Sequence, residues 1–359
     1  MELAQRRLDF AELNASIAPR DAAAGAQVMR RWNDIAKPVG SLGALEQMVA
    51  SIAELTGNPD VRADRRIVVV MCADNGVLAE GVASTPQDIT AVMAGFIAAG
   101  KSCVCIMAGA ANADVLPVDV GMARRAYGVR DEHIADGTGN IAAGAAMSRE
   151  QAERAIALGM ELAAECKARG YDIIATGEMG IGNTTTSSAV AAVLLGESAE
   201  RVTGRGAGID DAMLQRKVDV VKRAIEVNAP DAGDALDVLS KLGGYDIAAM
   251  AGLYIGGAIH RVPVLIDGII SSVAALVASR LCPACKVAML ASHRSAEPAS
   301  GAILRALGLN ALIDAQLRLG EGTGAVCALP LLDMALAVYR NMSTYGDIGA
   351  KAFIAPGEE

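Results

Sequence analysis

The feature that most constrains the fold is Ile67–Cys72, a run of six apolar residues, IVVVMC, with no polar residue among them. A strand with one face in water alternates apolar and polar residues, whereas a strand covered on both faces does not. Such strands belong mainly to parallel sheets, whose helical crossovers lie on both faces. We therefore predict that a parallel sheet begins here and that helices cover both of its sides.

Further strand and helix patterns alternate along the chain. The other predicted strands are 113–121, 171–176, 262–268 and 286–293. The predicted helices that bear on the later argument are 88–111, 148–169 and 299–319. The S-x-x-Q spacing at Ser148 is a capping box for the second of these helices. This alternation predicts a doubly wound α/β fold with a mostly parallel, Rossmann-like sheet of at least five strands.

The two ends of the chain differ from its middle. Residues 1–60 have helical patterns with few signals of buried strands, and 329–359 contains one more amphipathic helix. At 359 residues, the chain is long enough for one large domain with an appendage or for two domains. We predict a large α/β catalytic domain at 61–328 and a small helical domain that both terminal segments build together.

Charge and composition exclude several classes of protein. A net charge of -9 argues against a nucleic-acid partner, because clustered Lys and Arg are needed to neutralise phosphates. The stretch Val262–Leu281 approaches the ~20 apolar residues that span a bilayer. Asp267 and Gly268 interrupt this stretch, which therefore fits a strand, a loop and a helix better. The first residues lack the apolar core of a secretory signal, so we expect a cytoplasmic protein with no membrane partner.

The cysteines and histidines do not predict a metal site. Cys282 and Cys285 form a CxxC, but zinc would need a second pair or nearby histidines. The only histidines are His133, His260 and His293. The 7 cysteines lie largely in apolar segments, which is typical of reduced, buried thiols. We expect no metal and no cofactor.

A glycine-rich loop, Gly177–Thr185 (GEMGIGNTT), joins the strand at 171–176 to an Ala- and Val-rich helix. Gly180 and Gly182 free the backbone there, so that unpaired N–H groups and the positive end of a helix converge. Phosphates bind at such places, although a simple strand-to-helix turn has the same pattern. The loop lacks GK[ST] and does not fit GxGxxG, which leaves a mononucleotide phosphate as the expected ligand.

One carboxylate, Glu321, stands between glycines in Leu319–Ala325 (LGEGTGA), at the end of a helical pattern. Flanking glycines let backbone and ligand approach closely, so Glu321 is a candidate general base. The alternative is a C-cap glycine followed by a solvated acid. Lys217, in an amphipathic helical pattern, would by itself be interpreted as a solvated lysine.

Five motifs occur in order along the chain: KPVGSLGALE at 37–46, GEMGIGNTT at 177–185, LIDG at 265–268, SHRSAE at 292–297 and LGEGTGA at 319–325. Together they resemble the nicotinate-nucleotide:dimethylbenzimidazole phosphoribosyltransferases of cobalamin biosynthesis. The resemblance extends from about Lys37 almost to the C-terminus. It implies a Rossmann-like large domain and a small domain built from both termini. The implied reaction converts nicotinate mononucleotide and 5,6-dimethylbenzimidazole to α-ribazole 5'-phosphate and nicotinate, with inversion at C1'.

The resemblance also suggests roles for individual residues. Glu321 is similar to the family's catalytic base, and Glu178 to a second active-site carboxylate. The expected contacts of the donor nucleotide and its phosphate are Gly180, Ile181, Gly182, Asn183, Lys217, Ser295 and Arg318. The expected pocket for the aromatic base comprises Ser84, Thr85, Pro86 and Leu319. Asp267, in LIDG, is expected to position other groups.

Two departures from the family pattern concern the acceptor. Asn75 stands where relatives commonly have histidine, and Thr85 where serine or an aromatic residue is common. We expect both to lie around the base pocket, which leaves another benzimidazole, adenine or a phenol open as the acceptor. The alternatives to this transferase are a nucleotide N-glycoside hydrolase and a phenol-specific subunit of a heteromeric relative. The resemblance implies a homodimer, with a heteromer as the other arrangement.

Overall fold

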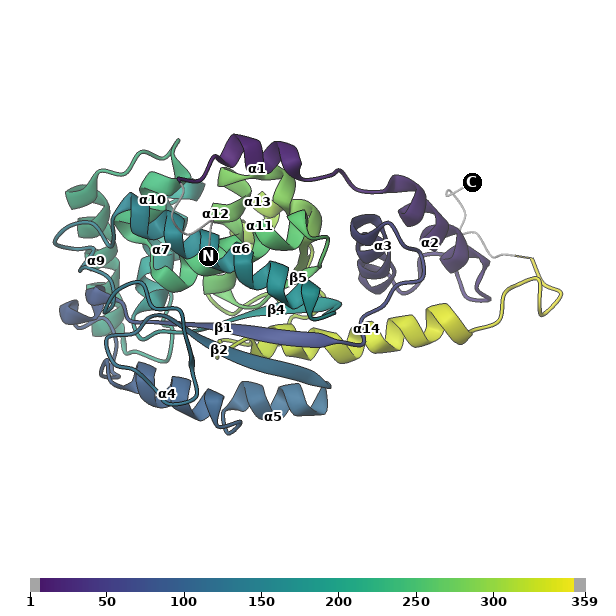
Figure 1. Ribbon diagram of the computed structural model, residues 1–359, viewed down its shortest axis with the longest axis horizontal. Coiled ribbons are helices and arrows are strands. Elements are labelled where there is room, and N and C mark those ends of the chain that lie inside the picture. Colours follow the sequence, from purple (N-terminus) through teal and green to yellow (C-terminus); the bar gives the residue numbers. More distant parts are fainter. Residues whose placement is uncertain (1–6, 352–359) are drawn as a thin grey trace.

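The computed structural model describes residues 7–351 and contains a six-stranded sheet in the order β3-β2-β1-β4-β5-β6 (Figure 1). The strands are β1 (Arg66–Ala73), β2 (Ala113–Gly121), β3 (Arg130–Asp131), β4 (Ile173–Met179), β5 (Val264–Ile266) and β6 (Met289–Ala291). Every neighbouring pair is parallel. This arrangement confirms the predicted doubly wound α/β fold. The two-residue edge strand β3 was not predicted, because a segment that short has no periodicity.

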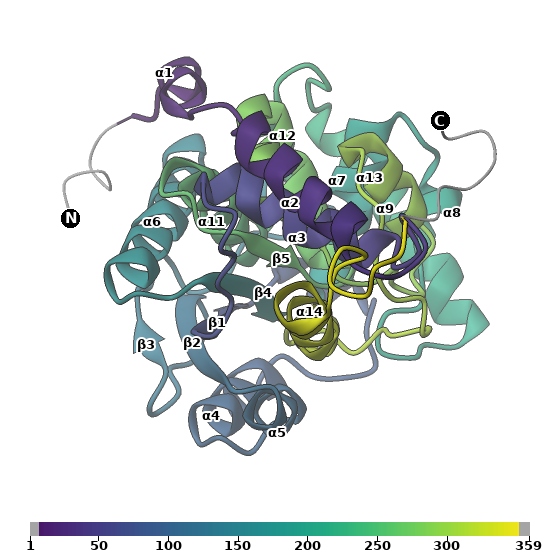
Figure 2. The same cartoon turned by 90° about the vertical axis from the view of Figure 1, so that its right-hand side faces the viewer.

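Both faces of the sheet are buried, as the unbroken apolar run at 67–72 predicts. Along β1, Ile67, Val69 and Met71 enter one core, whereas Val68 and Val70 enter the other. The first core includes α6 (Arg149–Ala168), α7 (Asn183–Leu195), α9 (Asp211–Asn228), α10 (Ala235–Leu242), α11 (Tyr245–Ile259) and α12 (Ile269–Leu281). The second includes α4 (Ile89–Ala98), α5 (Cys103–Ala110) and α14 (Thr323–Asn341), which lie on the opposite side of the sheet (Figure 2).

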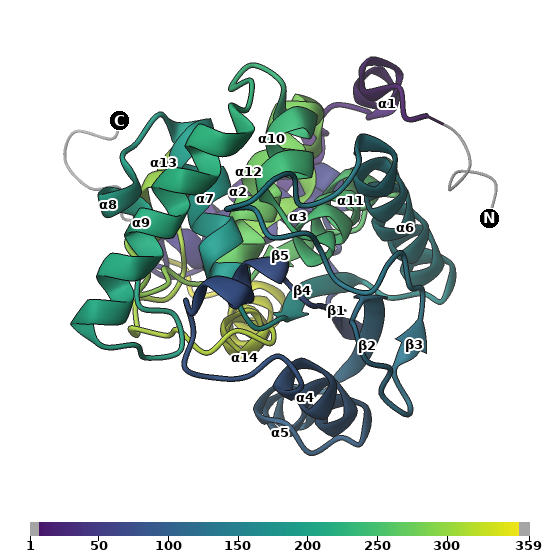
Figure 3. The same cartoon turned by 90° about the vertical axis from the view of Figure 1, so that its left-hand side faces the viewer.

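The strand order changes direction between β1 and β4, at the centre of the sheet. Open α/β sheets bind ligands at this point, outside the carboxyl ends of the strands. The Gly177–Thr185 loop covers the end of β4 and leads directly into α7. Figure 3 shows α4, α7 and α9 at this end of the molecule. The topology therefore brings the predicted phosphate loop to the expected ligand position.

A smaller group of helices lies beside the sheet domain: α2 (Ala22–Asp34), α3 (Ala44–Thr56) and the last turns of α14 (Figure 1). Trp32 is fully buried there, with its ring 5.2 Å from that of Tyr339 on α14. By contrast, α1 (Phe10–Ser16) packs on the large core, where Asn14 accepts a hydrogen bond from the Ala284 amide. The domain division at 60 and 328 stays a prediction, and residues 1–6 and 352–359 lie outside the described part.

Two predicted helices are shorter than their patterns. The pattern at 88–111 forms α4 and α5 separately, because Gly100 has φ of +72° and Ser102 caps α5 through the Cys105 amide. The pattern at 299–319 gives only α13 (Ser300–Leu307), which ends at Gly308 with φ of +73°. Glu321 therefore follows a loop and precedes α14, instead of following a helix.

Two apolar stretches, Ile89–Ala110 and Thr323–Asn341, could cross a membrane by length and composition alone. The first is interrupted between α4 and α5, and half of the second is buried inside the protein. Core helices of soluble proteins have the same properties, so these stretches are weak evidence for a membrane protein. The stretch Val262–Leu281 forms β5, a turn and α12, as predicted.

Candidate active site

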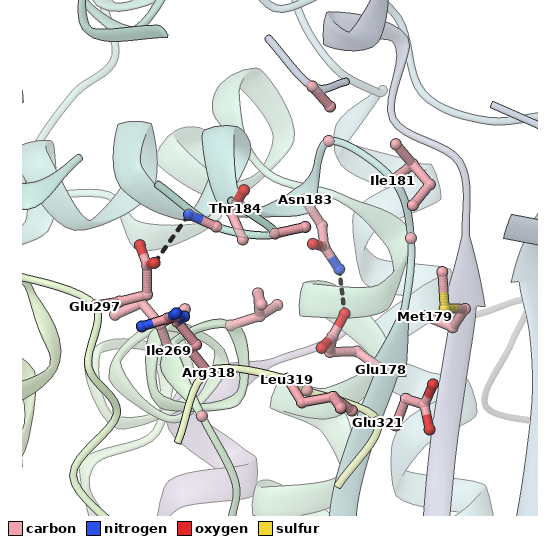
Figure 4. Close-up of a pocket in the computed structure, with 18 of the residues that line it drawn as sticks. Glu178, Met179, Ile181, Asn183, Thr184, Ile269, Glu297, Arg318, Leu319 and Glu321 are labelled. Carbon is pink, nitrogen blue, oxygen red and sulfur yellow. Dashed lines mark hydrogen bonds between the residues drawn. The ribbon is translucent and has the colours of Figure 1, made fainter. Parts of the chain in front are cut away.

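A cavity of about 280 Å³ opens at the carboxyl ends of the central strands. Four of the five motifs contribute to its walls: the glycine loop after β4, the turn after β5, the segment after β6 and the loop before α14. The fifth motif lies elsewhere, because Lys37 donates to Glu46 at 2.6 Å inside the small helical group. Figure 4 shows Glu178, Glu321, Asn183 and Leu319 around the cavity.

The glycine loop presents the N-terminus of α7 to the cavity. Gly182 is the N-cap, with φ of +97°, and it offers no capping side chain. The Ile181 amide donates to Thr90 Oγ1 at 3.2 Å, which ties the loop to α4. The Asn183 side chain does not cap the helix, because its amide donates to two carboxyl groups, Glu178 and Asp246. The Asn183 and Thr185 amides donate to the Gly180 and Gly182 carbonyls at 3.2 and 2.9 Å, so α7 offers an anion the Thr184 amide and the positive end of the helix.

Lys217 of α9 is almost fully buried, with 1% of its surface exposed, yet it faces the cavity. Its ammonium donates to Thr184 Oγ1 at 2.8 Å and to the Gly204 carbonyl at 3.1 Å. Both partners are neutral. Burial lowers the pKa of Lys217 to about 8, and the nearby Glu297 carboxylate opposes that shift. A buried cation with a third N–H to spare is suited to bind an anionic group.

Glycines make room for close contacts around Glu321. A Cβ at Gly320 would lie 2.3 Å from Glu178 Oε1, and one at Gly177 would lie 2.4 Å from the Glu321 carbonyl oxygen. Glu321 itself adopts φ of +60°, a conformation that costs a non-glycine residue on the order of 1 kcal/mol. Its Oε2 accepts the Val104 amide at the start of α5, at 3.2 Å. The tight loop thus holds one carboxylate against the wall of the cavity.

Glu178, at the end of β4, is the second carboxylate of the cavity. Its Oε2 accepts a hydrogen bond from Asn183 Nδ2, marked in Figure 4. Burial, together with the charges of Asp246 and Asp267, raises the pKa of Glu178 to about 8, although the Asn183 hydrogen bond lowers it. Glu178 therefore keeps its proton at neutral pH.

Asp267 holds the Glu321 loop from behind. Its two oxygens accept the Gly322 amide at 3.2 Å and the Ala325 amide at 3.0 Å, so it serves as the cap that α14 lacks. Burial raises the pKa of Asp267 and lowers that of the neighbouring His293. The expectation that Asp267 positions other groups agrees with these contacts.

Comparisons with known proteins identify the family. A family model described as phosphoribosyltransferase matches residues 17–349. The nicotinate-nucleotide-dimethylbenzimidazole phosphoribosyltransferase of Acetivibrio thermocellus is 45% identical over 322 residues, which are 89% of this chain and 92% of that protein. The chain belongs to this phosphoribosyltransferase family. The enzyme of the same name from Desulforudis audaxviator is 44% identical over 336 residues, 93% of this chain and 95% of its own.

A solved structure of the family has the same fold. The crystal structure of CobT from Thermus thermophilus superposes with a TM-score of 0.86 at 38% identity, covering 92% of this chain and all of that one. Together with the sequence relatives, it confirms the resemblance, the α/β fold and the class of enzyme, a pentosyl transferase.

The phosphoribosyltransferase brings almost all of the expected site residues to one cavity. The cavity is lined by Ser84, Thr85, Glu178, Gly180, Ile181, Gly182, Asn183, Lys217, Ser295, Arg318, Leu319 and Glu321. Pro86 does not line it. Ser295 is buried, and its hydroxyl donates to the Leu317 carbonyl at 3.3 Å. Arg318 is exposed at the cavity. The roles of these residues remain predictions.

The expectation that Asn75 lies around the base pocket is wrong. Asn75 is buried behind the phosphate loop, where its Oδ1 accepts from Thr186 Oγ1 at 3.3 Å. A Cβ on Gly182 would lie 3.4 Å from the Asn75 Cβ. Thr85, the other departure, does line the cavity. Of the two departures, only Thr85 therefore lines the cavity.

Several cavity residues have no signal in the sequence patterns. Ile89 and Met93 of α4, with Met179 and Val82, add an apolar wall that periodicity cannot distinguish from core packing. Glu297, the last residue of SHRSAE, is buried and accepts the Gly206 amide at 2.9 Å. In the sequence, only the position of Glu297 in that motif pointed to a place in the site.

Proposed function

We propose that this phosphoribosyltransferase moves 5-phosphoribose from nicotinate mononucleotide to 5,6-dimethylbenzimidazole or a related aromatic base, in the assembly of the cobalamin nucleotide loop. The observation that carries the proposal is a cavity that combines a buried lysine beside a glycine loop with two buried carboxylates and an apolar wall. The names of the relatives from Acetivibrio thermocellus and Desulforudis audaxviator support the same reaction.

The donor phosphate would bind where positive charge collects. The N-terminus of α7 and the Lys217 ammonium lie at one region of the cavity, where Lys217 donates to Thr184, and Arg318 adds an exposed guanidinium. Both hydrogen-bond acceptors of the lysine are neutral and one of its N–H groups is unused, so a phosphate gains a charge-assisted hydrogen bond there. Ser295 and the Gly180–Asn183 backbone would complete the donor site.

The proposed reaction needs one general base and no general acid. Nicotinate leaves C1' from a pyridinium that already carries a positive charge, so its departure needs no proton. As one acceptor nitrogen attacks C1' with inversion, the other nitrogen must lose its proton. Glu178 already holds a proton at neutral pH, which leaves Glu321 to accept this one. General bases of this kind contribute roughly 10²- to 10⁴-fold to the rate.

The acceptor would lie against the apolar wall. Leu319 is 58% exposed beside Glu321, and Ile89 and Met93 face the same cavity from α4. Ser84 and Thr85 supply hydroxyls at its edge. A flat aromatic base fits between such walls, and the hydroxyls at Ser84 and Thr85 would select among benzimidazoles, adenine and phenols.

The first experiment measures nicotinate release from nicotinate mononucleotide by the purified protein, with and without 5,6-dimethylbenzimidazole. We expect release to require the acceptor and to fall by about 10²-fold or more in Glu321→Gln. Glu226→Gln, which changes an exposed glutamate of α9, is the matched control and should behave as the unaltered protein. Release without any acceptor would identify a hydrolase. No release with this base, adenine or phenol would refute the transferase assignment.

We further propose that the enzyme is a cytoplasmic homodimer. The support is an apolar face on α4 and α5, where Phe96 is 49% and Ile106 is 67% exposed. Sedimentation analysis should give a dimer that Phe96→Glu with Ile106→Glu converts to monomer. A monomeric unaltered protein, or one that assembles only with a different subunit, would contradict the homodimer.

A further inference from the structure

A buried carboxylate outside the cavity contacts one of the cavity's wall residues. Asp246 is the second residue of α11 and has no exposed surface. Its Oδ2 accepts from Asn183 Nδ2 at 3.0 Å, and its Oδ1 accepts the Ile247 amide at 2.9 Å. Both oxygens are therefore used as acceptors. A carboxylate meets both demands, whereas an asparagine could meet only one.

The Asn183 amide connects this carboxylate to the active site. Its nitrogen carries two hydrogens, and it donates to Glu178 Oε2 as well as to Asp246 Oδ2. If the amide flipped, its carbonyl oxygen would face the Asp246 carboxylate, which has no proton to donate, and that hydrogen bond would be lost. The position of Asp246 thus determines how Asn183 meets Glu178.

Glycines are placed to accommodate Asp246. A Cβ on Gly244 would lie 2.4 Å from Asp246 Oδ1, and one on Gly180 would lie 3.3 Å from Oδ2. Gly244 has φ of -146°, an extended conformation that any residue adopts. Its lack of a side chain is therefore explained by the room that the Asp246 carboxylate and, at 2.8 Å, the Asn75 amide oxygen need, not by the backbone.

The two buried acids, Asp246 and Glu178, differ in pKa. Burial raises the pKa of Asp246 to about 6, below the value of about 8 for Glu178. Asp74 and Asp267 add negative charge from the ends of β1 and β5, and Glu321 adds its backbone amide. No Lys or Arg in residues 7–351 forms an ion pair with Asp246 or Glu178. Near neutral pH, Asp246 is ionised and Glu178 keeps its proton.

We propose that Asp246 is a positioning residue of the transfer reaction, which acts through the Asn183 amide to set the orientation of Glu178. The inference rests on the proposed function, because it concerns how the same cavity is prepared for the reaction. It assigns a role to a residue that does not touch the substrate.

Asp246→Asn tests the charge and one hydrogen bond together. We expect kcat to fall by about 10²-fold, the size of effect that a small misplacement in an active site produces. The KM for nicotinate mononucleotide should change little, because Lys217 and the glycine loop are untouched. The alkaline limb of the kcat profile should move to lower pH, since the negative charge of Asp246 no longer favours the proton on Glu178. A purely structural defect would not move this limb.

Gly244→Ala provides a second variant that keeps every ionisable group. Its methyl group would displace the Asp246 carboxylate, so we expect kcat to fall without loss of folding. Gly144→Ala is the matched control, because a Cβ there meets nothing within 4 Å, and it should retain full activity. In a double-mutant cycle, adding Asp246→Ala to Asn183→Ala should cost no further activity.

The outcomes separate this inference from the proposed function. An inactive unaltered protein, tested with all three classes of acceptor, refutes both. If the unaltered protein releases nicotinate and Asp246→Asn and Gly244→Ala retain its kcat and pH profile, the inference alone is wrong. Additive losses in the cycle would also overturn it, because Asp246 would then not act through Asn183.

Discussion

Replacing Glu178 with glutamine should make the protein more stable at alkaline pH while changing it little at pH 5. The folded-state pKa of Glu178 is about 8, against the usual 4.5 of a glutamate. The folded protein therefore retains a proton that the unfolded chain loses over this interval. Stability is fully present below pH 4.5 and declines as the pH rises to about 8. A glutamine does not titrate in this range, so the stability of the Glu178→Gln variant does not decline in this way.

The magnitude follows from the two pKa values. Each unit between them corresponds to ~1.4 kcal/mol, so ionising Glu178 in the folded protein costs on the order of 5 kcal/mol. For a chain of this size, that corresponds to a difference of roughly 5–10 °C in Tm between the two proteins. The glutamine oxygen can still accept from Asn183, so the change in packing is small and independent of pH.

The assay is thermal unfolding of both proteins at intervals from pH 5 to pH 9. Other ionisable groups affect both proteins equally and cancel in the difference. Glu226→Gln, on the exposed face of α9, should give a curve parallel to that of the unaltered protein. Parallel curves for Glu178→Gln as well would show that Glu178 titrates as an ordinary glutamate. It would then be ionised at neutral pH, and its role as the protonated partner of Glu321 would be refuted.

Two further predictions concern the lysine and the small helical group. Lys217→Met should raise the KM for nicotinate mononucleotide by about 10- to 100-fold, the value of a charged hydrogen bond, without changing the KM of the acceptor. In steady-state kinetics, the unaltered protein's donor KM should also rise above about pH 8, where Lys217 loses its proton, and an equal rise in the variant would contradict this. Trp32→Ala should lower the free energy of unfolding in urea by about 3–5 kcal/mol, because it leaves a cavity against Tyr339. A loss below about 1 kcal/mol would show that this contact does not hold the two termini together.

The parallel sheet could be predicted because its signal is local. A buried strand such as Ile67–Cys72 has to be apolar at every position, whatever the rest of the chain does. The breaks in the helices could not be predicted in the same way. Apolar periodicity continues through Gly100 and Ser102, and the helix is broken there because Gly100 takes a left-handed conformation and Ser102 caps a new helix. The local sequence allows either a continuous helix or a broken one at these positions, and tertiary packing decides between the two.

The site was predicted only as far as its parts lie in motifs. Glu178 and Asn183 share one glycine loop, so their closeness is visible in the sequence. Asp246 lies 63 residues beyond Asn183, at the start of another helix, and nothing in its surroundings marks it as part of the same hydrogen-bonded group. Asn75 illustrates the opposite error. It occupies a position expected to be near the acceptor, but its side chain turns under the loop.

The distribution of charge in the cavity is a physical reason to favour the proposed substrate. Nicotinate mononucleotide carries a phosphate at one end of its ribose and, at the other, a pyridinium nitrogen bonded to C1', on a ring that also bears a carboxylate. The cavity has its buried cation, Lys217, hydrogen-bonded to Thr184 of α7, whereas its carboxyl groups, Glu178 and Glu321, gather where β4 and the loop before α14 meet. A ligand with a single charge would satisfy only one of these regions and would leave the other desolvated. The proposed nucleotide would satisfy both, with its phosphate at Lys217 and its ring nitrogen, which is positive until nicotinate departs, toward the carboxyl end.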